Sequence, residues 1–257
     1  MVSVTQRIKH IKQPRGGYIP PKLMHQQFFE DGKMLSEENI SPALMGVMVD
    51  YLTRFKQTGD FEQAFDIPLK GMQLAKLSLP DLPMIAEAKK LIPLISDFSD
   101  KSIAAATAFT SYFDTLYRQG SSALKFLEPK IPDAATMENM RIMVDRATKF
   151  FTDESPIVKS ELTFVGGYTE TITQGDADFM SSDTLWDMKV SKKAPLNKYT
   201  LQLAVYYSMA KHSGDSDYQS LTTVGIFNPR LNIAYRLPMS KIDLAVIEAI
   251  DQEVIGY

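Results

Sequence analysis

The chain has 257 residues, a formal net charge of −3 and no cysteine. Without cysteine it cannot form disulfides, thiolate zinc sites or iron–sulfur clusters. Its three histidines, His10, His25 and His212, are too widely spaced in sequence to form a zinc motif. Any metal chemistry would therefore depend mainly on carboxylates, which favour hard cations such as Mg²⁺ or Mn²⁺.

No apolar run approaches the roughly 20 residues that a membrane span needs, and the first residues lack the apolar core of a secretory signal. We therefore expect a cytoplasmic protein with no membrane partner. Basic residues gather in two stretches despite the acidic balance: Arg7, Lys9, Lys12 and Arg15, and Lys189, Lys192, Lys193 and Lys198. They are either solvated surface charges or groups that bind the phosphates of a nucleic acid.

The N-terminal half has the pattern of helices. Ser41-Pro42 is a suitable cap and first turn for a helix through about Phe55, with an apolar stripe that includes Leu44 and Leu52. Prolines and Asp/Ser-rich connectors separate the segments that follow. Further helices are expected over residues 61–75, 84–98, 103–119 and 136–151.

After Thr152 the pattern changes to strands, which we expect over residues 157–165, 170–180 and 185–190. Gly166-Gly167 and Ser181–Asp183 between them suit tight reversals, so the three strands should form an antiparallel meander. The remaining elements are a helix over 197–211, strands over 221–227 and 233–238, and a helix over 241–254. This order predicts an α/β fold with a mixed sheet.

The first candidate catalytic residues lie on the second and third of the three strands predicted after Thr152. Side chains alternate along a strand, so Asp187 and Lys189 share one face while Trp186 and Met188 point to the other. The turn between the strands can bring Asp178 close to Asp187. Two adjacent carboxylates repel each other, and a divalent cation removes that repulsion. Such a cation would polarise a phosphate oxygen and activate water.

Lys189 would hold or help to deprotonate the attacking water, or stabilise charge on the phosphate. The alternative is a surface hairpin whose Asp and Lys merely pair across strands, worth roughly a few tenths of a kcal/mol. The apolar neighbours Leu185, Trp186 and Met188 indicate instead an interior strand, where charges need a structural or functional reason.

Gly175-x-x-Asp178, a hairpin and Asp187-x-Lys189 together resemble the bipartite signature of the PD-(D/E)XK nuclease superfamily. The similarity is to its RecB-like and lambda-exonuclease-like branch. It implies a restriction-endonuclease-like core in which helices flank a mixed central sheet (αβββαβ), here with an additional N-terminal helical region. It further implies that Asp178, Asp187 and Lys189 are catalytic and that both aspartates hold Mg²⁺ or Mn²⁺.

Members of that branch carry a Gln and, four positions later, a Tyr on the helix after the Lys. Gln202 and Tyr206 match this spacing, which places them together on one helical face. The resemblance implies a catalytic role for Gln202 and substrate binding by Tyr206. Lys192 and Lys193, in the second basic stretch, are expected to bind substrate as well.

Two further metal ligands follow from the resemblance. Glu161 lies on the strand before the hairpin, where such enzymes often have a Glu; otherwise it is a charge at the strand edge. Asp50 occupies the position of a His on an early family helix; otherwise it pairs with Arg54 one turn later.

The resemblance covers roughly residues 157–210 and 41–55 and leaves the rest of the chain unassigned. We expect a single nuclease-like domain over 1–257, with a helical insertion over 56–135 and a catalytic core over 136–257. The insertion could be a substrate clamp or a protein-partner surface. We expect a Mg²⁺-dependent deoxyribonuclease, of the exonuclease or repair and defence type. Two alternatives stay open: a catalytically inactive module of this fold that binds nucleic acid or protein, and an unrelated α/β scaffold.

Overall fold

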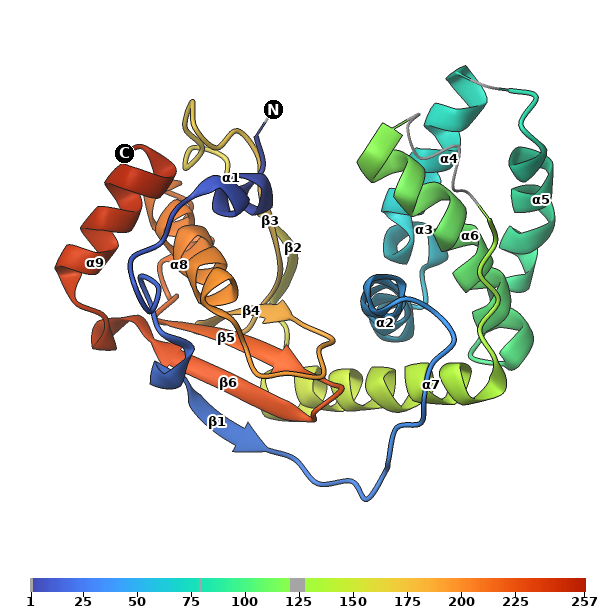
Figure 1. Ribbon diagram of the computed structural model, residues 1–257, viewed down its shortest axis with the longest axis horizontal. Helices are drawn as coiled ribbons and strands as arrows, with labels where there is room; N and C mark the ends of the chain where they lie inside the picture. Colours follow the sequence, from blue (N-terminus) through green and yellow to red (C-terminus); the bar gives the residue numbers. More distant parts are fainter. Residues whose placement is uncertain (1, 79, 121–127) are drawn as a thin grey trace. The chain divides into compact units, whose positions relative to one another are not determined.

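The computed structural model describes residues 2–78, 80–120 and 128–257, without the side chain of Glu161 (Figure 1). The chain divides into two compact units, each described here by itself. The sheet unit comprises Met1–Glu30 and Lys149–Tyr257, and the helical unit comprises Asp31–Thr148.

Within the described residues of the sheet unit, six strands form one mixed sheet in the order β1-β6-β5-β4-β3-β2. β4 and β5 are parallel, and every other neighbouring pair is antiparallel. The expected α/β fold with a mixed sheet is confirmed, as is the antiparallel meander of β2, β3 and β4. The strands are β1 His25–Phe28, β2 Lys159–Thr163, β3 Asp176–Met180, β4 Thr184–Met188, β5 Thr223–Asn228 and β6 Ile233–Pro238.

The connection between β2 and β3 is longer than predicted. Gly166, with φ of +91°, and Gly167 do form a turn, in which Gly167 N–H donates to Phe164 O. However, β3 begins only at Asp176, because residues 168–175 form a loop rather than the start of a strand. The turn at Gly166-Gly167 is therefore present but does not by itself connect β2 to β3, whereas the tight reversal expected at Ser181–Asp183 is confirmed.

Two elements of the sheet unit were not predicted. Helix α1 (Val4–His10) begins at a capping box in which Ser3 and Gln6 bond reciprocally. Strand β1 pairs with β6 at the edge of the sheet, and its polar residues are mostly exposed. A short polar edge strand lacks the alternation that identifies a strand in a sequence.

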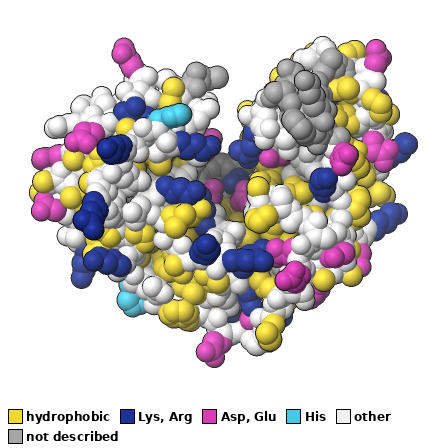
Figure 2. Space-filling view, viewed as in Figure 1, with side chains coloured by type: hydrophobic (Ala, Val, Ile, Leu, Met, Phe, Trp, Pro, Cys, Tyr) yellow, Lys and Arg dark blue, Asp and Glu magenta, His cyan; other side chains and the backbone are white. Residues whose placement is uncertain are grey.

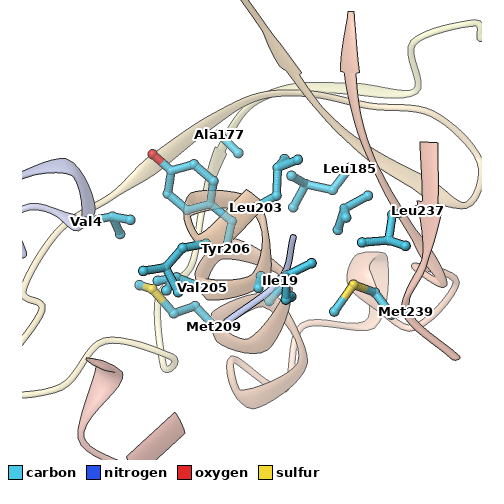
Figure 3. Close-up of a cluster of buried hydrophobic side chains, with 14 of the residues drawn as sticks. Val4, Ile19, Ala177, Leu185, Leu203, Val205, Tyr206, Met209, Leu237 and Met239 are labelled. Atoms are coloured by element: carbon cyan, nitrogen blue, oxygen red, sulfur yellow. The ribbon is translucent and has the colours of Figure 1, made fainter. Parts of the chain in front are cut away.

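Helices cover one face of the sheet and an aromatic cluster lies on the other. The covering helices are α1, α8 (Asn197–His212) and α9 (Leu244–Ala249), which continues as a π-helical segment over Ile250–Ile255. Buried apolar side chains of α1, α8 and the π-helical segment form a core with the strands, part of which is shown in Figure 3. On the opposite face the ring of Trp186 packs against Phe150 and Phe151, with ring centroids 5.0 and 6.3 Å apart.

Six helices form the described part of the helical unit. The first, α2, begins as predicted: the Ser41 side chain accepts from Leu44 N–H and Pro42 is its first residue. The helix predicted over 61–75 is instead two helices that break at Phe65, and the one predicted over 84–98 ends at Leu91, before a 3₁₀ turn that contains Pro93. The six are α2 Pro42–Thr58, α3 Phe61–Ala64, α4 Asp66–Ser78, α5 Pro83–Leu91, α6 Asp100–Gln119 and α7 Ala134–Lys149.

The two units are divided differently from the predicted insertion over 56–135 and core over 136–257. Helices α2 and α7, which flank the predicted insertion, belong to the helical unit, and residues 1–30 belong to the sheet unit. Arg141 of α7, for example, donates to Phe98 O. None of the described helices is long and apolar enough to cross a bilayer.

Candidate active site

Strand β4 lies between β3 and β5, and all five of its residues are buried. Its alternation is confirmed by the contacts of Trp186, whose indole N–H donates to Ser155 Oγ (2.9 Å) and Ser181 Oγ (3.2 Å) on the aromatic face. Asp187 therefore lies on the face that α8 covers. An interior strand, rather than a surface hairpin, carries this carboxylate.

Asp187 is only 3% exposed, and its charge is balanced by Lys189. Lys189 Nζ lies 2.7 Å from Oδ1 and 2.6 Å from Oδ2 of Asp187. The backbone N–H of Lys189 donates to Phe227 O at 3.0 Å, so the parallel pairing with β5 continues one residue beyond the end of β4. Lys189 is thus fixed by its backbone as well as by its ammonium group.

Asp178 lies where β3 and β4 separate. The strands pair at Met180–Leu185 and Phe179–Trp186, and the same register would next place Asp178 opposite Asp187. At that point the pairing stops, and Asp178 Oδ2 accepts from Met188 N–H at 2.8 Å. The side chain thereby replaces a backbone partner and is held beside the Asp187–Lys189 pair, as the sequence predicted.

The electrostatics of the site show the same grouping. Burial alone lowers the pKa of Lys189, but the Asp187 and Asp178 carboxylates more than offset it, so the pKa lies above its usual value. Burial also raises the pKa of the Tyr206 hydroxyl, and both carboxylates raise it further. Lys189 and Tyr206 therefore experience the field of both aspartates.

Helix α8 places Gln202 and Tyr206 together, as their spacing predicted. Gln202 Nε2 donates to Tyr206 Oη at 3.0 Å, and Tyr206 is only 4% exposed. One residue of this helix was missed: the Tyr199 ring lies under the Lys189 ammonium, with Nζ 5.4 Å from the ring centroid. An aromatic residue in the first turn after a basic loop was the available signal.

The other residues predicted for the site do not all lie beside Asp178, Asp187 and Lys189. Lys192 and Lys193 are exposed in the loop between β4 and α8. Glu161 lies in β2 between Ser160 and Leu162, whose partners Phe179 and Ala177 flank Asp178, but its side chain is outside the described part of the chain. Asp50 belongs to the helical unit, where Oδ1 lies 3.2 Å from Arg54 Nε, the ion pair foreseen as the alternative to a metal role.

The donor set at β3 and β4 suits a hard cation only in part. Two carboxylates offer oxygen ligands of the kind that Mg²⁺ and Mn²⁺ prefer. No group of three or more Asp, Glu or His side chains that could hold a metal occurs among the described residues. Asp178 and Asp187 thus match a cation that keeps several ligands from water and substrate, as Mg²⁺ usually does.

A comparison of the chain with protein-family models, with curated proteins and with solved structures finds no match.

Proposed function

We propose that the protein is a metal-dependent deoxyribonuclease whose active site is the Asp178–Asp187–Lys189 cluster. The observation that carries this proposal is the juxtaposition of two carboxylates and a partly buried ammonium group at the point where β3 and β4 separate. Asp187 is almost completely buried, and Asp178 and Lys189 are partly buried. Withdrawing charged groups from water in this way is costly, and functional sites commonly bear such a cost. Sites of this composition suit the hydrolysis of phosphodiesters.

Asp178 and Asp187 would hold one divalent cation, Mg²⁺ or Mn²⁺. When bound, the cation supplies a Lewis acid for a phosphate oxygen and lowers the pKa of water. Lys189 supplies positive charge beside the carboxylates, where it would stabilise the negative charge that develops on the phosphate. Gln202 and Tyr206 are hydrogen-bonded to each other, the Tyr206 hydroxyl lies within the field of both carboxylates, and the two side chains would orient the substrate.

The test is cleavage of end-labelled single- and double-stranded DNA in Mg²⁺, Mn²⁺ or EDTA. We expect metal-dependent cleavage by the wild type and a loss on the order of 10²- to 10³-fold for Asp178→Asn, Asp187→Asn and Lys189→Met. Glu248→Gln, which removes an exposed carboxylate of α9 in the same unit, is the matched control and should cleave normally. Circular DNA as a second substrate distinguishes cleavage within a strand from cleavage at ends.

Calorimetric titration with Mn²⁺ gives a readout that does not depend on activity. Binding to the wild type that Asp178→Ala and Asp187→Ala both abolish supports a metal site at these residues. Wild-type protein that neither binds Mn²⁺ nor cleaves any DNA would contradict the proposal and favour a binding module without catalysis.

A further inference from the structure

Positive charge is concentrated in two stretches of the chain, residues 1–29 and 189–214. Neither stretch contains an Asp or Glu, and each contains five Lys or Arg residues. The rest of the chain keeps 18 of the 28 Lys and Arg residues beside all 31 Asp and Glu, which gives it a formal net charge of −13. The overall charge of −3 is therefore the sum of two basic stretches and a strongly acidic remainder.

The fold joins the two stretches within the sheet unit. Helix α1 packs against α8 (Figure 1), and Val4 and Ile8 share a buried core with Leu201 and Val205. The segment after α1 follows the beginning of α8, where Thr200 Oγ1 donates to Ile19 O. Gly17 approaches so closely there that a Cβ would lie 2.7 Å from the Asn197 side chain.

Six exposed side chains of these stretches form what we call the basic strip. None of the six makes an ion pair within the described part of the chain, although Lys149 and Lys159 of the same unit both do. Figure 2 shows Lys and Arg side chains spread over the face of the sheet unit on which α1 lies. The members of the basic strip are Lys9, Lys12, Arg15, Lys192, Lys193 and Lys198.

The basic strip is continuous with the candidate active site through Tyr199. The ammonium groups of Lys198 and Lys189 lie 5.0 and 5.4 Å from the centroid of the same Tyr199 ring. Lys198 also sits in the first turn of α8, which has no side-chain cap and no acidic residue there. A cation at the positive end of a helix dipole is unfavourable, and a bound phosphate nearby would relieve that repulsion.

We infer that the basic strip binds the phosphate backbone of a nucleic-acid strand and leads that strand to the Asp178–Asp187–Lys189 cluster. The inference rests on the proposed function, which supplies the cluster's role. Unpaired ammonium and guanidinium groups bind phosphates through counterion release, without reading the base sequence. The strip thus determines affinity for the strand, whereas the cluster would perform the chemistry.

Binding is tested on the full chain in EDTA, so that no cleavage contributes. The variant Lys12→Gln/Arg15→Gln/Lys198→Gln removes three charges of the basic strip, and its matched control Lys76→Gln/Lys89→Gln/Lys101→Gln removes three exposed charges of the helical unit. Fluorescence anisotropy with a labelled single-stranded oligonucleotide and with a duplex, at several salt concentrations, gives affinity and salt dependence. Circular dichroism verifies that both variants fold.

We expect the strip variant to bind about 10- to 100-fold more weakly at low salt, with a log–log salt slope reduced by about 2 for the single strand. The control should bind like the wild type. Equal losses in both variants, or none in the strip variant, would overturn the inference, as would binding of anionic phospholipid vesicles in place of oligonucleotides. If the strip variant binds DNA more weakly but the wild type never cleaves DNA, the binding role of the basic strip is supported and the proposed nuclease function is contradicted. If the wild type cleaves DNA with metal but the strip variant binds like the wild type, the nuclease function is supported and the binding role of the strip is contradicted.

Discussion

Gly225 and the indole of Trp186 meet between β5 and β4, where the two residues are register partners. A Cβ on Gly225 would lie 2.3 Å from Cζ3 of Trp186, far inside normal contact distance. Trp186 is fixed on its other side by its hydrogen bonds to Ser155 and Ser181. The glycine is therefore needed for Trp186 to hold β4, and with it Asp187, in the observed position.

Gly225→Ala should lower the free energy of unfolding by about 1–3 kcal/mol, because the core would be overpacked. Trp186 is the chain's single tryptophan, so its emission spectrum reports the displacement directly. Denaturation followed by circular dichroism measures the loss. The double variant Gly225→Ala/Trp186→Phe should lose less free energy of unfolding than the sum of the losses in the two single variants. Strictly additive losses would show that the new methyl group does not contact the indole.

The hydrogen bond between Gln202 and Tyr206 is a second feature at the residue scale. Burial and the carboxylates of Asp187, Asp178 and Asp176 raise the pKa of Tyr206, so its hydroxyl stays neutral in ordinary buffers and accepts from the Gln202 amide. Removing either side chain leaves the other without its hydrogen-bond partner in a largely buried environment. Such losses cost more than the bond itself contributes.

Tyr206→Phe should reduce the free energy of unfolding by about 1–2 kcal/mol. In a double-mutant cycle with Gln202→Leu, the coupling should be about 0.5–1.5 kcal/mol. Urea denaturation of the four proteins gives the cycle. A coupling near zero would mean that the two side chains act independently in solution.

At the scale of elements, the segment before α2 is attached to α7 by an ion pair inside the helical unit. Arg146, which is only 9% exposed, donates from Nε to Asp31 Oδ2 (2.6 Å) and from Nη2 to Asp31 Oδ1 (2.8 Å). The hydrogen bonds from Arg146 lower the pKa of Asp31 from 3.8 to about 2, against the opposing effect of burial. A bidentate pair of this kind is among the stronger ones.

Asp31→Asn should lower the free energy of unfolding by about 2 kcal/mol at neutral pH, because it leaves a buried guanidinium group with a neutral partner. The folded-state pKa is depressed, so the stabilisation is complete above about pH 4 and is lost as the pH falls toward 2. Denaturant titrations at pH 7 and near pH 2 measure this. The free energies of unfolding of wild type and variant should differ at pH 7 and converge near pH 2. A difference that stays constant with pH would contradict a stabilising role for the ionised Asp31 carboxylate.

The sequence predicted which side chains lie near one another on β3, β4 and α8 better than it predicted the elements around them. Strand alternation and the turn at Ser181–Asp183 predicted the grouping of Asp178, Asp187 and Lys189, and helical spacing predicted that Gln202 and Tyr206 share a face, whereas the choice of Gln202 and Tyr206 came from the resemblance. The break at Phe65 and the loop over 168–175 depend on packing by distant residues. For example, Tyr168 Oη donates to Gly175 O and holds that loop closed, a contact that no periodicity predicts.

At the scale of the whole molecule, the chain leaves and re-enters the sheet unit at neighbouring points. The rings of Phe29 and Phe150, close to the two exits, pack edge to face with centroids 5.6 Å apart. The helical unit is thus an insertion in the sequence of the sheet unit, and its removal would leave two chain ends that a short linker can join.

Replacement of Asp31–Thr148 by a short Gly/Ser linker should give a folded sheet unit with native-like Trp186 emission. Its six strands and their covering helices lie outside the deleted segment. Trp186 emission and thermal denaturation followed by circular dichroism measure the result. For the thermal denaturation, the same deletion combined with Trp186→Ala, which removes the largest core ring, is the unfolded control. A deletion variant without a cooperative transition would show that the sheet unit depends on the helical unit.

The edge strand β1 has a consequence for how the protein is made. His25 pairs with Arg236, so β1, the first of the six described strands of this sheet to be synthesised, is bound by a strand made about 200 residues later. At roughly 5–20 residues per second, β1 waits on the order of ten seconds or more for its partner. Meanwhile the helical unit is complete and free to fold, so we expect it to form first during translation. Three of the four residues of β1 are polar, which suits that interval, because an unpaired strand of apolar residues would invite aggregation.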